Sequence, residues 1–458
     1  MKLIYGIKDR PKFGQTIVFA IQQLLAIMAA TLVVPVIINS SGTMPEGAPA
    51  MSSAAALLGA GIGTLVYLLF TRFKSPVFLG SSFAFIGSMC SAFAGAVSAQ
   101  AGYLGLIIGA ACAGLVYVVI AIIVKFAGVK WISKLMPAVV IGPTVAIIGL
   151  SLAGNAIGDL QTAPAGGSSY VAILCGLVTL AVTMLCATFG KKMIRLIPFI
   201  MGILAGYALA AIFTLIGNAA GIDALKVINF DPLTNLFTEF SIKSIVSLPD
   251  FTFVEAIKGV KDIDGAYIGT VAVAYAPVAF VVFAEHIADH KNLSTIIEKD
   301  LLEDPGLHNT LLGDGVGSIA GAFFGGCPNT TYGESVGCVA ITGNASVITI
   351  LYTAFLAIVI SFLSPFVAFV NTIPACVMGG VCMALYGFIA VSGLKMIQKV
   401  DLEKNRNLFV VSVILIAGIG GLSVSFGKVT LTTIACALIL GILTNLMLGV
   451  KDKKKDEE

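Results

Sequence analysis

The sequence predicts an all-α polytopic membrane protein whose fourteen transmembrane segments form two inverted halves of seven. Three observations lead to this fold class: an apolar composition, the regular recurrence of long apolar segments, and basic residues that gather in alternate loops. Of the 458 residues, 58% are hydrophobic and 11% are charged, whereas a soluble domain has about 25% charged residues. The composition therefore indicates a protein embedded in a lipid bilayer.

Apolar segments of about 20 residues recur along the whole chain, and each is long enough to cross a hydrocarbon core about 30 Å thick. The sequence contains fourteen of them. Two, the third and the tenth, are unusually short. The segments begin near Gly14, Ser52, Val77, Gly105, Leu135, Val171, Leu196, Ala266, Leu307, Pro328, Ala345, Pro374, Leu408 and Leu431.

Basic residues gather in every second loop, as expected because short cytoplasmic loops collect Lys and Arg. Of the 27 basic residues, 22 fall on the side of the N-terminus, and four of the five exceptions lie between 226 and 261, one long external segment. The predicted cytoplasmic clusters lie in residues 2–12, 72–74, 125–134, 191–195, 291–299, 395–406 and 451–455. Both termini are therefore expected on the cytoplasmic side of the cell (inner, cytoplasmic) membrane. The net charge of +3 reflects this topology, and no nucleic acid partner is expected.

Two short sequence patterns recur in the second half of the chain. Residues 136–142 (MPAVVIG) match residues 373–379 (IPACVMG) at four of seven positions, and residues 81–85 (SSFAF) correspond in type to residues 330–334 (TTYGE). Because each half holds an odd number of spans, the second half must start on the opposite side of the membrane. Inverted repeats of this kind are typical of secondary transporters, whose sites lie near the bilayer midplane.

The two short spans predict broken helices at this midplane. Residues 81–85 follow Pro76, and residues 330–334 follow Pro328. Hydroxyl and aromatic residues after a proline favour a short extended stretch, followed by a half-helix. Non-helical backbone at membrane depth is tolerated where it lines a cavity, so spans three and ten are expected to form a binding site.

Few ionisable residues lie inside the predicted spans, and each is costly in a membrane. They are Glu285, His286, Asp289, His290, Asp314 and Glu334. Glu285 and Asp289 are four residues apart and therefore share one helix face. A carboxylate in a low-dielectric site next to a second carboxylate favours proton uptake, so Glu285, with Asp289 and Asp314, is assigned to proton coupling.

Glu334 is expected near the N-terminus of a half-helix, where the partial positive charge favours a carboxylate. An ionised carboxylate only accepts hydrogen bonds, so it suits a ligand with ring N–H donors. Together with the backbone N–H groups of Phe83 and Gly333, it would match a cyclic imide that presents N–H beside C=O.

At these residues the sequence resembles the nucleobase–ascorbate transporter family, also called nucleobase:cation symporter family two, and within it the bacterial uracil permeases. The similar stretches are LGSSFAF (79–85), AEH (284–286), KDLLEDPGLH (299–308) and PNTTYGES (328–335). The family signature, an acid or amide, a small polar residue, a glycine two positions on and a threonine five beyond it, corresponds to Glu334, Ser335, Gly337 and Thr342. The resemblance extends over nearly the whole chain.

This resemblance implies a core domain, made by spans one to four and eight to eleven, that moves against a gate domain as an elevator in a homodimer. The core would comprise residues 14–130 and 266–370, and the gate would comprise residues 131–220 and 371–450. An external connecting segment (221–265) and a cytoplasmic tail (451–458) complete the chain.

The resemblance also implies a substrate and a site. Glutamate at the start of the signature accompanies uracil, whereas glutamine followed by asparagine accompanies xanthine or urate, so uracil import with a proton as coupling ion is expected. Glu285 and Glu334 would bind the base, and the amides of Phe83 and Gly333 would meet its carbonyls. Further residues expected in the pocket are Ser82, Ala30, Tyr332 and Tyr386. No cofactor or metal is expected.

Three alternatives compete with this interpretation. Asp289 and Asp314 resemble the purine-handling branch, so a purine permease of the same fold remains open. A sulfate- or dicarboxylate-type anion transporter is disfavoured, because the broken segments contain no Arg or Lys. An intramembrane metalloenzyme would use His286 and His290, spaced as zinc ligands can be, but Glu285 precedes His286 instead of following it as in HExxH, and Asp314 is the sole candidate for a third ligand.

Overall fold

The computed structural model describes residues 3–128, 137–164, 166–191, 193–238, 241–426 and 429–455. The predicted boundary between residues 130 and 131, the start of the fifth span at Leu135 and residue 136 of the first repeat motif lie outside these residues. The same holds for the basic positions 2, 130, 134, 192 and 428.

Eight helices of the described chain are long and apolar enough to cross a membrane. They are α1 (Phe13–Ser40), α2 (Ser53–Phe70), α4 (Ala99–Ala127), α6 with α7 (Ala138–Ser151 and Ala153–Gln161), α8 (Ser169–Phe189), α10 (Pro198–Ala220), α13 (Gly265–Ile297) and α18 (Ala375–Ile397). The chain is therefore a helical, multi-pass membrane protein. That fourteen segments cross the bilayer stays a prediction.

Further helices occupy the other apolar segments. They are α3 (Ile86–Ala94), α14 (Leu307–Gly325), α15 (Gly333–Thr342), α16 (Val347–Ser361), α19 (Asn405–Ile419) and α20 (Thr433–Lys455). Connecting helices are α9 (Met193–Leu196), α11 (Asp231–Thr238), α12 (Thr252–Lys258) and α17 (Ser364–Thr372). A small hairpin of β3 (Val424–Phe426) and β4 (Val429–Leu431) precedes α20.

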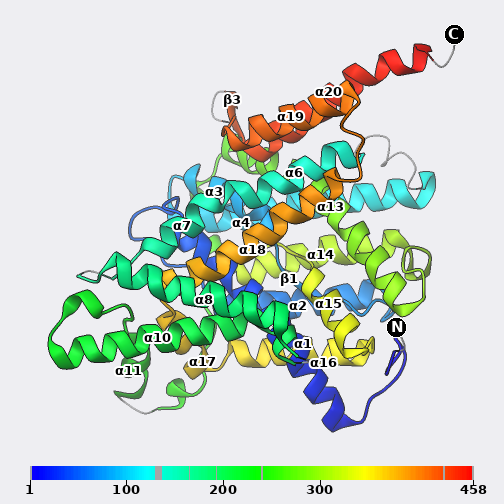
Figure 1. The fold of residues 1–458 in the computed structure, drawn as a ribbon. Coiled ribbons are helices and arrows are strands. Elements are labelled where there is room, and N and C mark those ends of the chain that lie inside the picture. Colours follow the sequence, from blue (N-terminus) through cyan, green and yellow to red (C-terminus); the bar gives the residue numbers. More distant parts are fainter. Residues whose placement is uncertain are drawn as a thin grey trace.

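The two broken spans meet as a pair of short strands in the middle of the molecule (Figure 1). Strand β1 (Leu79–Ser81) pairs antiparallel with β2 (Asn329–Thr331), with Gly80 opposite Thr330. The extended stretches therefore start earlier and are shorter than the sequence suggested. Phe83–Phe85 forms a 3-10 turn (η1) that leads into α3, and Gly333 and Glu334 already belong to α15.

Small residues bring α2 and α14 close enough to support the strand pair. An added Cβ at Gly59 would lie 2.5 Å from the carbonyl oxygen of Gly321, so the two backbones touch where only glycine fits. The side chain of Asn329 inserts beside this contact, and its Nδ2 donates to the Gly59 carbonyl over 2.8 Å. The strand pair is thus fixed to the helices beneath it.

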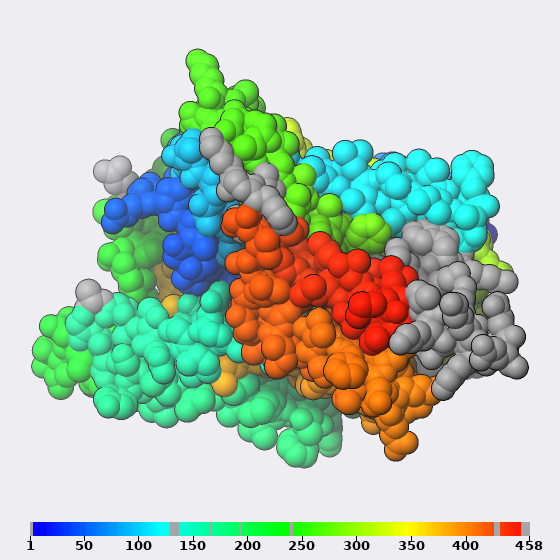
Figure 2. Space-filling view, turned by 90° about the horizontal axis from the view of Figure 1, so that it is seen from above, coloured from blue at the N-terminus to red at the C-terminus, as the bar shows by residue number. Residues whose placement is uncertain are grey.

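The helices pack in two groups. The first contains α1, α2, α4, α13, α14 and α16, and the second contains α6, α8, α10, α18, α19 and α20. Figure 2 shows the orange and red surface of the C-terminal helices in the middle of one face, between the teal surface of the early second group and the cyan surface of α4. Fewer contacts join the groups than hold each group together, and the central cavity lies between them.

Both ends of α1 contact other parts of the chain. At the C-terminal end of α1, the hydroxyl of Ser40 donates to Oδ2 of Asp159 on α7 over 3.4 Å, which joins the two groups. At the other end of α1, the N-terminal segment pairs with the loop after α15: the amide of Ile4 donates to the Gly343 carbonyl over 2.8 Å, and the amide of Ala345 donates to the Tyr5 carbonyl over 2.9 Å.

Candidate functional site

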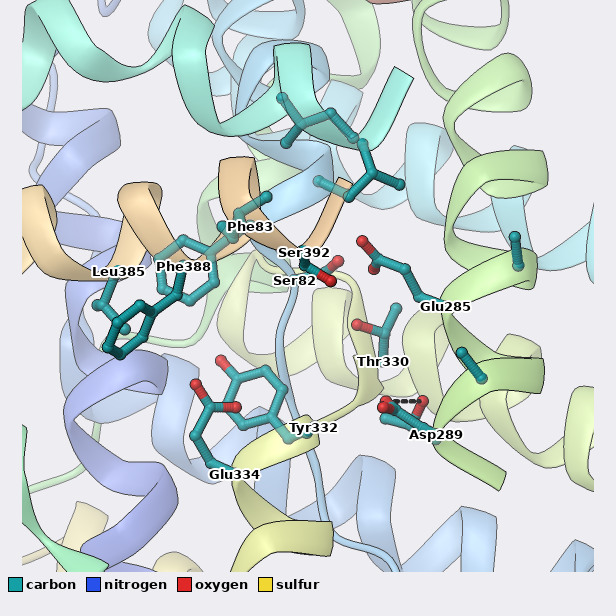
Figure 3. A pocket seen from close by; sticks show the side chains of 18 of the residues that line it. Ser82, Phe83, Glu285, Asp289, Thr330, Tyr332, Glu334, Leu385, Phe388 and Ser392 are labelled. Atoms are coloured by element: carbon teal, nitrogen blue, oxygen red, sulfur yellow. Dashed lines mark hydrogen bonds between the residues drawn. The ribbon is translucent and has the colours of Figure 1, made fainter. Parts of the chain in front are cut away.

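A cavity of about 460 Å³ lies where the strand pair meets α13 and α18 (Figure 3). Its polar wall comes from the residues after β1 and β2 and from α13. Its apolar wall comes from α6 and α18. The lining residues are Ser82, Phe83, Ala84, Val145, Ile148, Ala284, Glu285, Ala288, Asp289, Thr330, Thr331, Tyr332, Gly333, Glu334, Leu385, Phe388, Ile389, Ser392 and Met396.

The ends of both strands direct helix N-termini toward the cavity. Phe83 is the first residue of η1, and Gly333 is the first residue of α15. The amides of the first turn of a helix have no partner within that helix, and the helix dipole places partial positive charge there. The cavity therefore offers backbone donors from two directions, as the sequence predicted for Phe83 and Gly333.

The crossing of the two broken spans is held by Tyr332. Its hydroxyl donates to the Ser81 carbonyl over 2.6 Å, so the residue after β2 is bonded to the last residue of β1. Gly80 lies under the ring, and a Cβ there would approach the ring carbon Cε2 to 2.4 Å. Only glycine leaves room for this ring.

Three carboxylates reach the cavity. Glu285 and Asp289 project from α13, and Glu334 projects from the first turn of α15 (Figure 3). The Thr331 hydroxyl donates to Oδ2 of Asp289 over 3.3 Å. No Lys or Arg is among the described residues that line the cavity. Carboxylates without a cation accept hydrogen bonds or protons, so the site suits a neutral ligand with N–H donors and disfavours an anion.

The N-terminus of α15 is anchored from behind. Nε2 of Gln23 on α1 donates to the Ser335 hydroxyl over 2.6 Å, and the amide of Phe78 donates to the same oxygen over 3.0 Å. Ser335 follows Glu334 directly, so these bonds hold the helix turn that carries the carboxylate.

Asp314, expected to take part in coupling, lies outside the cavity. It is fully buried on α14, and its Oδ2 lies 2.8 Å from Nδ1 of His286. The structure thus separates Asp314 from the other two coupling candidates, Glu285 and Asp289, which line the cavity.

Two residues expected from the resemblance do not line the cavity. Ala30 is buried within the packing of α1. Tyr386 lies next to the cavity residue Leu385, and its ring meets that of Phe83 edge-on at 6.3 Å between centroids. Tyr386 thus supports Phe83 from behind, with its buried hydroxyl unpartnered among the described residues.

The sequence analysis named only Tyr386 from α18 and missed the residues of this helix that line the cavity. Leu385, Phe388, Ile389, Ser392 and Met396 all face it. These residues are spaced so that they lie on one side of a helix. The sequence did not reveal that this side lines the cavity, because α18 is apolar on nearly every side and no face differs from the others.

The histidine pair offers no open metal site. Nδ1 of His290 contacts the His286 carbonyl, and Nε2 contacts the Tyr67 hydroxyl, at 2.8 and 2.7 Å. Both ring nitrogens of His286 are also engaged, by Asp314 and by Thr310. Within the described residues, no group of three or more His, Cys, Asp or Glu side chains is placed to hold a metal ion.

Two transporters of known structure have a similar fold. The transmembrane domain of the cyanobacterial bicarbonate transporter BicA aligns with a TM-score of 0.58 at 14% identity, covering 96% of this chain and 98% of that one. Murine Solute Carrier 26 family member A9, an anion transporter in the inward-facing state, aligns with a TM-score of 0.62 at 12% identity, covering 97% of this chain and 69% of that one. At such low identity the likeness shows the fold alone.

Sequence relatives are closer. The uracil permease of Bacillus subtilis is 37% identical and aligns over 99% of this chain and 98% of its own length. The uracil permeases of Bacillus caldolyticus (36%, 98% of this chain and 95% of that protein) and Escherichia coli K12 (34%, 99% and 96%) align equally broadly. A model described as the Permease family matches residues 14–426. The chain is therefore a multi-pass cell-membrane transporter and no enzyme, and it belongs to the nucleobase–ascorbate transporter family of permeases.

Proposed function

We propose that this permease imports uracil by proton symport through an elevator-type movement. The observation that carries the substrate is Glu334: it stands at the head of α15 in the cavity, in a chain whose full-length relatives are uracil permeases. Uracil presents two ring N–H groups and two carbonyl oxygens. Glu334 accepts from a ring N–H, and the amides of Phe83 and Gly333 donate to the carbonyls.

The packing supports a seven-plus-seven inverted repeat. Helix α2 packs on α16 as α14 packs on α4, and α8 packs on α10 as α19 packs on α20. If the two halves are exchanged, the contact of α2 with α16 becomes the contact of α14 with α4, and the contact of α8 with α10 becomes that of α19 with α20. A pseudo-two-fold axis in the membrane plane requires this correspondence. The helix starts agree, since α6 and α18 each begin directly after a proline, Pro137 and Pro374.

The cavity walls support a core that moves against a gate. The polar ligands belong to the proposed core, and the gate wall of α6 and α18 is apolar apart from Ser392. A core that carries the polar ligands with it can slide along an apolar wall without breaking substrate hydrogen bonds. The wall also includes Met396, beside the basic segment 395–406, so the proposed open side is cytoplasmic, and both termini lie there too. The homodimer remains a proposal from the family resemblance.

Proton coupling is proposed for Glu285, Asp289 and Asp314. Glu285 and Asp289 share the cavity with Glu334, so their mutual repulsion favours uptake of a proton. Neutralising a carboxylate lowers the cost of moving the loaded core through the membrane.

The experiment that tests this function is radiolabelled uracil uptake into proteoliposomes under an inward proton gradient, with and without protonophore. We expect accumulation that the protonophore abolishes and that excess xanthine leaves intact. If no uracil is taken up under any gradient, uracil is not the substrate.

A purine is the second candidate, because the cavity has room for it. A volume of about 460 Å³ lies within the range of roughly 300 to 1,000 Å³ that holds drug-sized ligands, and Asp289 adds an acceptor beyond Glu285 and Glu334. Xanthine that accumulates in the same assay, or displaces uracil, would favour the purine branch.

A further inference from the structure

The two histidines of α13 face away from the cavity. Glu285 and Asp289 line the cavity, whereas His286 and His290, each one position later, point toward α14 and α2. Both histidines are fully buried, and their rings stack at 4.0 Å between centroids. They form a polar cluster with no part in the proposed substrate site.

The protonation of His290 is fixed by its partners. Its Nδ1 lies 2.8 Å from the carbonyl of His286, which only accepts, so Nδ1 carries a hydrogen. Its Nε2 lies 2.7 Å from the Tyr67 hydroxyl, which lies 2.8 Å from the Ser75 hydroxyl. Neither ring nitrogen contacts a carboxylate, so the buried ring is neutral: Ser75 donates to Tyr67, and Tyr67 donates to Nε2.

The partners of His286 allow two states. Its Nδ1 lies 2.8 Å from Oδ2 of Asp314, and its Nε2 lies 3.0 Å from the Thr310 hydroxyl. That hydroxyl also lies 3.0 Å from the Leu307 carbonyl. Thr310 has one hydrogen, which points either to Nε2 or to the Leu307 carbonyl.

The two orientations of Thr310 differ by one proton. When Thr310 donates to Nε2, the imidazole is neutral and donates from Nδ1 to the Asp314 carboxylate. When Thr310 donates to Leu307, Nε2 carries its own hydrogen and donates to Thr310. His286, Thr310 and Asp314 together then hold one proton more: either His286 is an imidazolium beside the Asp314 carboxylate, or His286 is a neutral imidazole beside the Asp314 carboxylic acid. A hydroxyl rotation accommodates this proton without moving a heavy atom.

We infer that His286, Thr310 and Asp314 form a buried site for one exchangeable proton, separate from the cavity carboxylates. A second observation supports it: Asp314 is fully buried, and among the described residues its ion-pair partner is His286 and no Lys or Arg, so an uncompensated negative charge there is costly, and the added proton compensates it. The proton comes from water and forms only the N–H or O–H bond that holds it.

Other titratable groups lie near this site, both on α13 itself and on the neighbouring helices. Glu285, Asp289 and His290 lie on α13, Tyr67 lies on α2, and Tyr117 of α4 has a buried hydroxyl without a partner in the described chain. No lysine or arginine is among the hydrogen-bond partners of this cluster in the described residues. The cluster therefore becomes neutral when it gains the proton. A role for this proton in transport rests on the proposed function, but its binding does not.

The test uses the fact that the chain has three histidines. The full-length protein is labelled with ¹⁵N-histidine and placed in lipid nanodiscs without substrate, and His308→Gln removes the third histidine signal. We expect Nε2 of His286 to change from unprotonated to protonated as the pH falls, while His290 keeps its hydrogen on Nδ1 throughout. A His286 signal that stays in one state over the whole pH range in which transport varies would overturn the inference.

Thr310 supplies the matched variants. Thr310→Val removes the hydrogen bond to Nε2 in both states, but the proton-rich state loses more because its buried N–H is left without an acceptor, so the His286 midpoint should fall by about one pH unit, a tenfold loss of proton affinity. Thr310→Ser keeps the hydroxyl and should restore the wild-type midpoint. Equal midpoints for Val and Ser would contradict the site, and the wild-type spectrum decides alone if the valine variant does not fold.

These outcomes separate the inference from the proposed function. If the protein does not transport uracil but the protonation of His286 changes with pH, the proton site is supported and uracil is not the substrate. If the protein accumulates uracil but the protonation of His286 does not change, the proposed function is supported and the proton site is wrong.

Discussion

The two faces of α13 carry different kinds of ionisable side chain. The cavity face carries Glu285 and Asp289, and the rear face carries His286 and His290. This alternation follows from the helical turn of about 100° per residue. Substitutions on the two faces should therefore have different consequences.

At Glu334 we expect the glutamine substitution to weaken uracil binding by about 10- to 100-fold. A hydrogen bond to a charged group contributes roughly 1.5–3 kcal/mol, and the neutral amide of Glu334→Gln gives a weaker acceptor. Equilibrium binding of labelled uracil to the purified protein measures the change. Thr342→Ser, at the far end of α15, serves as the control, and an unchanged affinity for Glu334→Gln would remove the carboxylate from the site.

At Glu285 we expect glutamine to separate coupling from exchange. Glu285→Gln cannot gain or lose a proton, so proton-driven accumulation should fall at least about 10-fold, as expected for a lost coupling group. Exchange of internal for external uracil needs no net proton movement and should fall less. Accumulation and exchange that decline in parallel would instead make Glu285 a simple binding residue.

At the level of elements, local sequence predicted the broken spans well. Proline, hydroxyl and aromatic residues placed Ser82, Phe83, Tyr332, Gly333 and Glu334 at one site, and all five line the cavity. These residues sit in short segments whose conformation depends on their immediate neighbours. The register of the strand pair could not be predicted, because it aligns two segments that lie far apart in the sequence, with Gly80 opposite Thr330.

The same reasoning explains which positions could not be predicted. Asp314 was assigned to proton coupling together with Glu285 and Asp289, but the sequence shows only which residues are ionisable and not the side of α14 on which each lies. Its position beside His286 is set by the rotation of α14 against α13. Ala30 and Tyr386 likewise depend on how α1 and α18 are rotated, which apolar sequences do not reveal.

The strand crossing should be intolerant of a single methyl group. In Gly80→Ala, the new Cβ would meet the Tyr332 ring at 2.4 Å, and overpacking of this kind costs roughly 1–3 kcal/mol. Because Tyr332 borders the cavity, we expect both lower thermal stability and loss of uracil binding. Thermal unfolding followed by fluorescence, together with the binding assay, measures both effects.

The control for this substitution is Gly14→Ala, where no atom lies within 4 Å of the added Cβ. It should leave stability and binding near wild type. A Gly80→Ala protein that binds uracil normally would mean that Tyr332 can move away from Ser81 at little cost.

At the scale of the whole molecule, the two helix groups enclose the cavity between them and also touch each other outside it. The cavity lies between the polar ends of the broken spans and the apolar wall of α18, and the contact of Ser40 with Asp159 joins α1 to α7. An elevator requires that one group slide past the other, so a contact between groups at the closed side must break in every transport cycle.

A covalent bond at this contact should stop transport without abolishing binding. Cysteines replace Ser40 and Asp159, whose side-chain oxygens lie 3.4 Å apart, in a variant whose nine native cysteines are replaced by serine or alanine. Oxidation should reduce uracil transport at least about 10-fold, and reduction should restore it, because a disulfide forms only when the two Cα atoms stay within about 7 Å. Uracil affinity should change less than about twofold, since neither position lines the cavity. The single-cysteine variants show the effect of each substitution without the bond. Full transport by the oxidised pair would mean that the two groups stay together at this point, and the elevator would have to be replaced by a movement within one group.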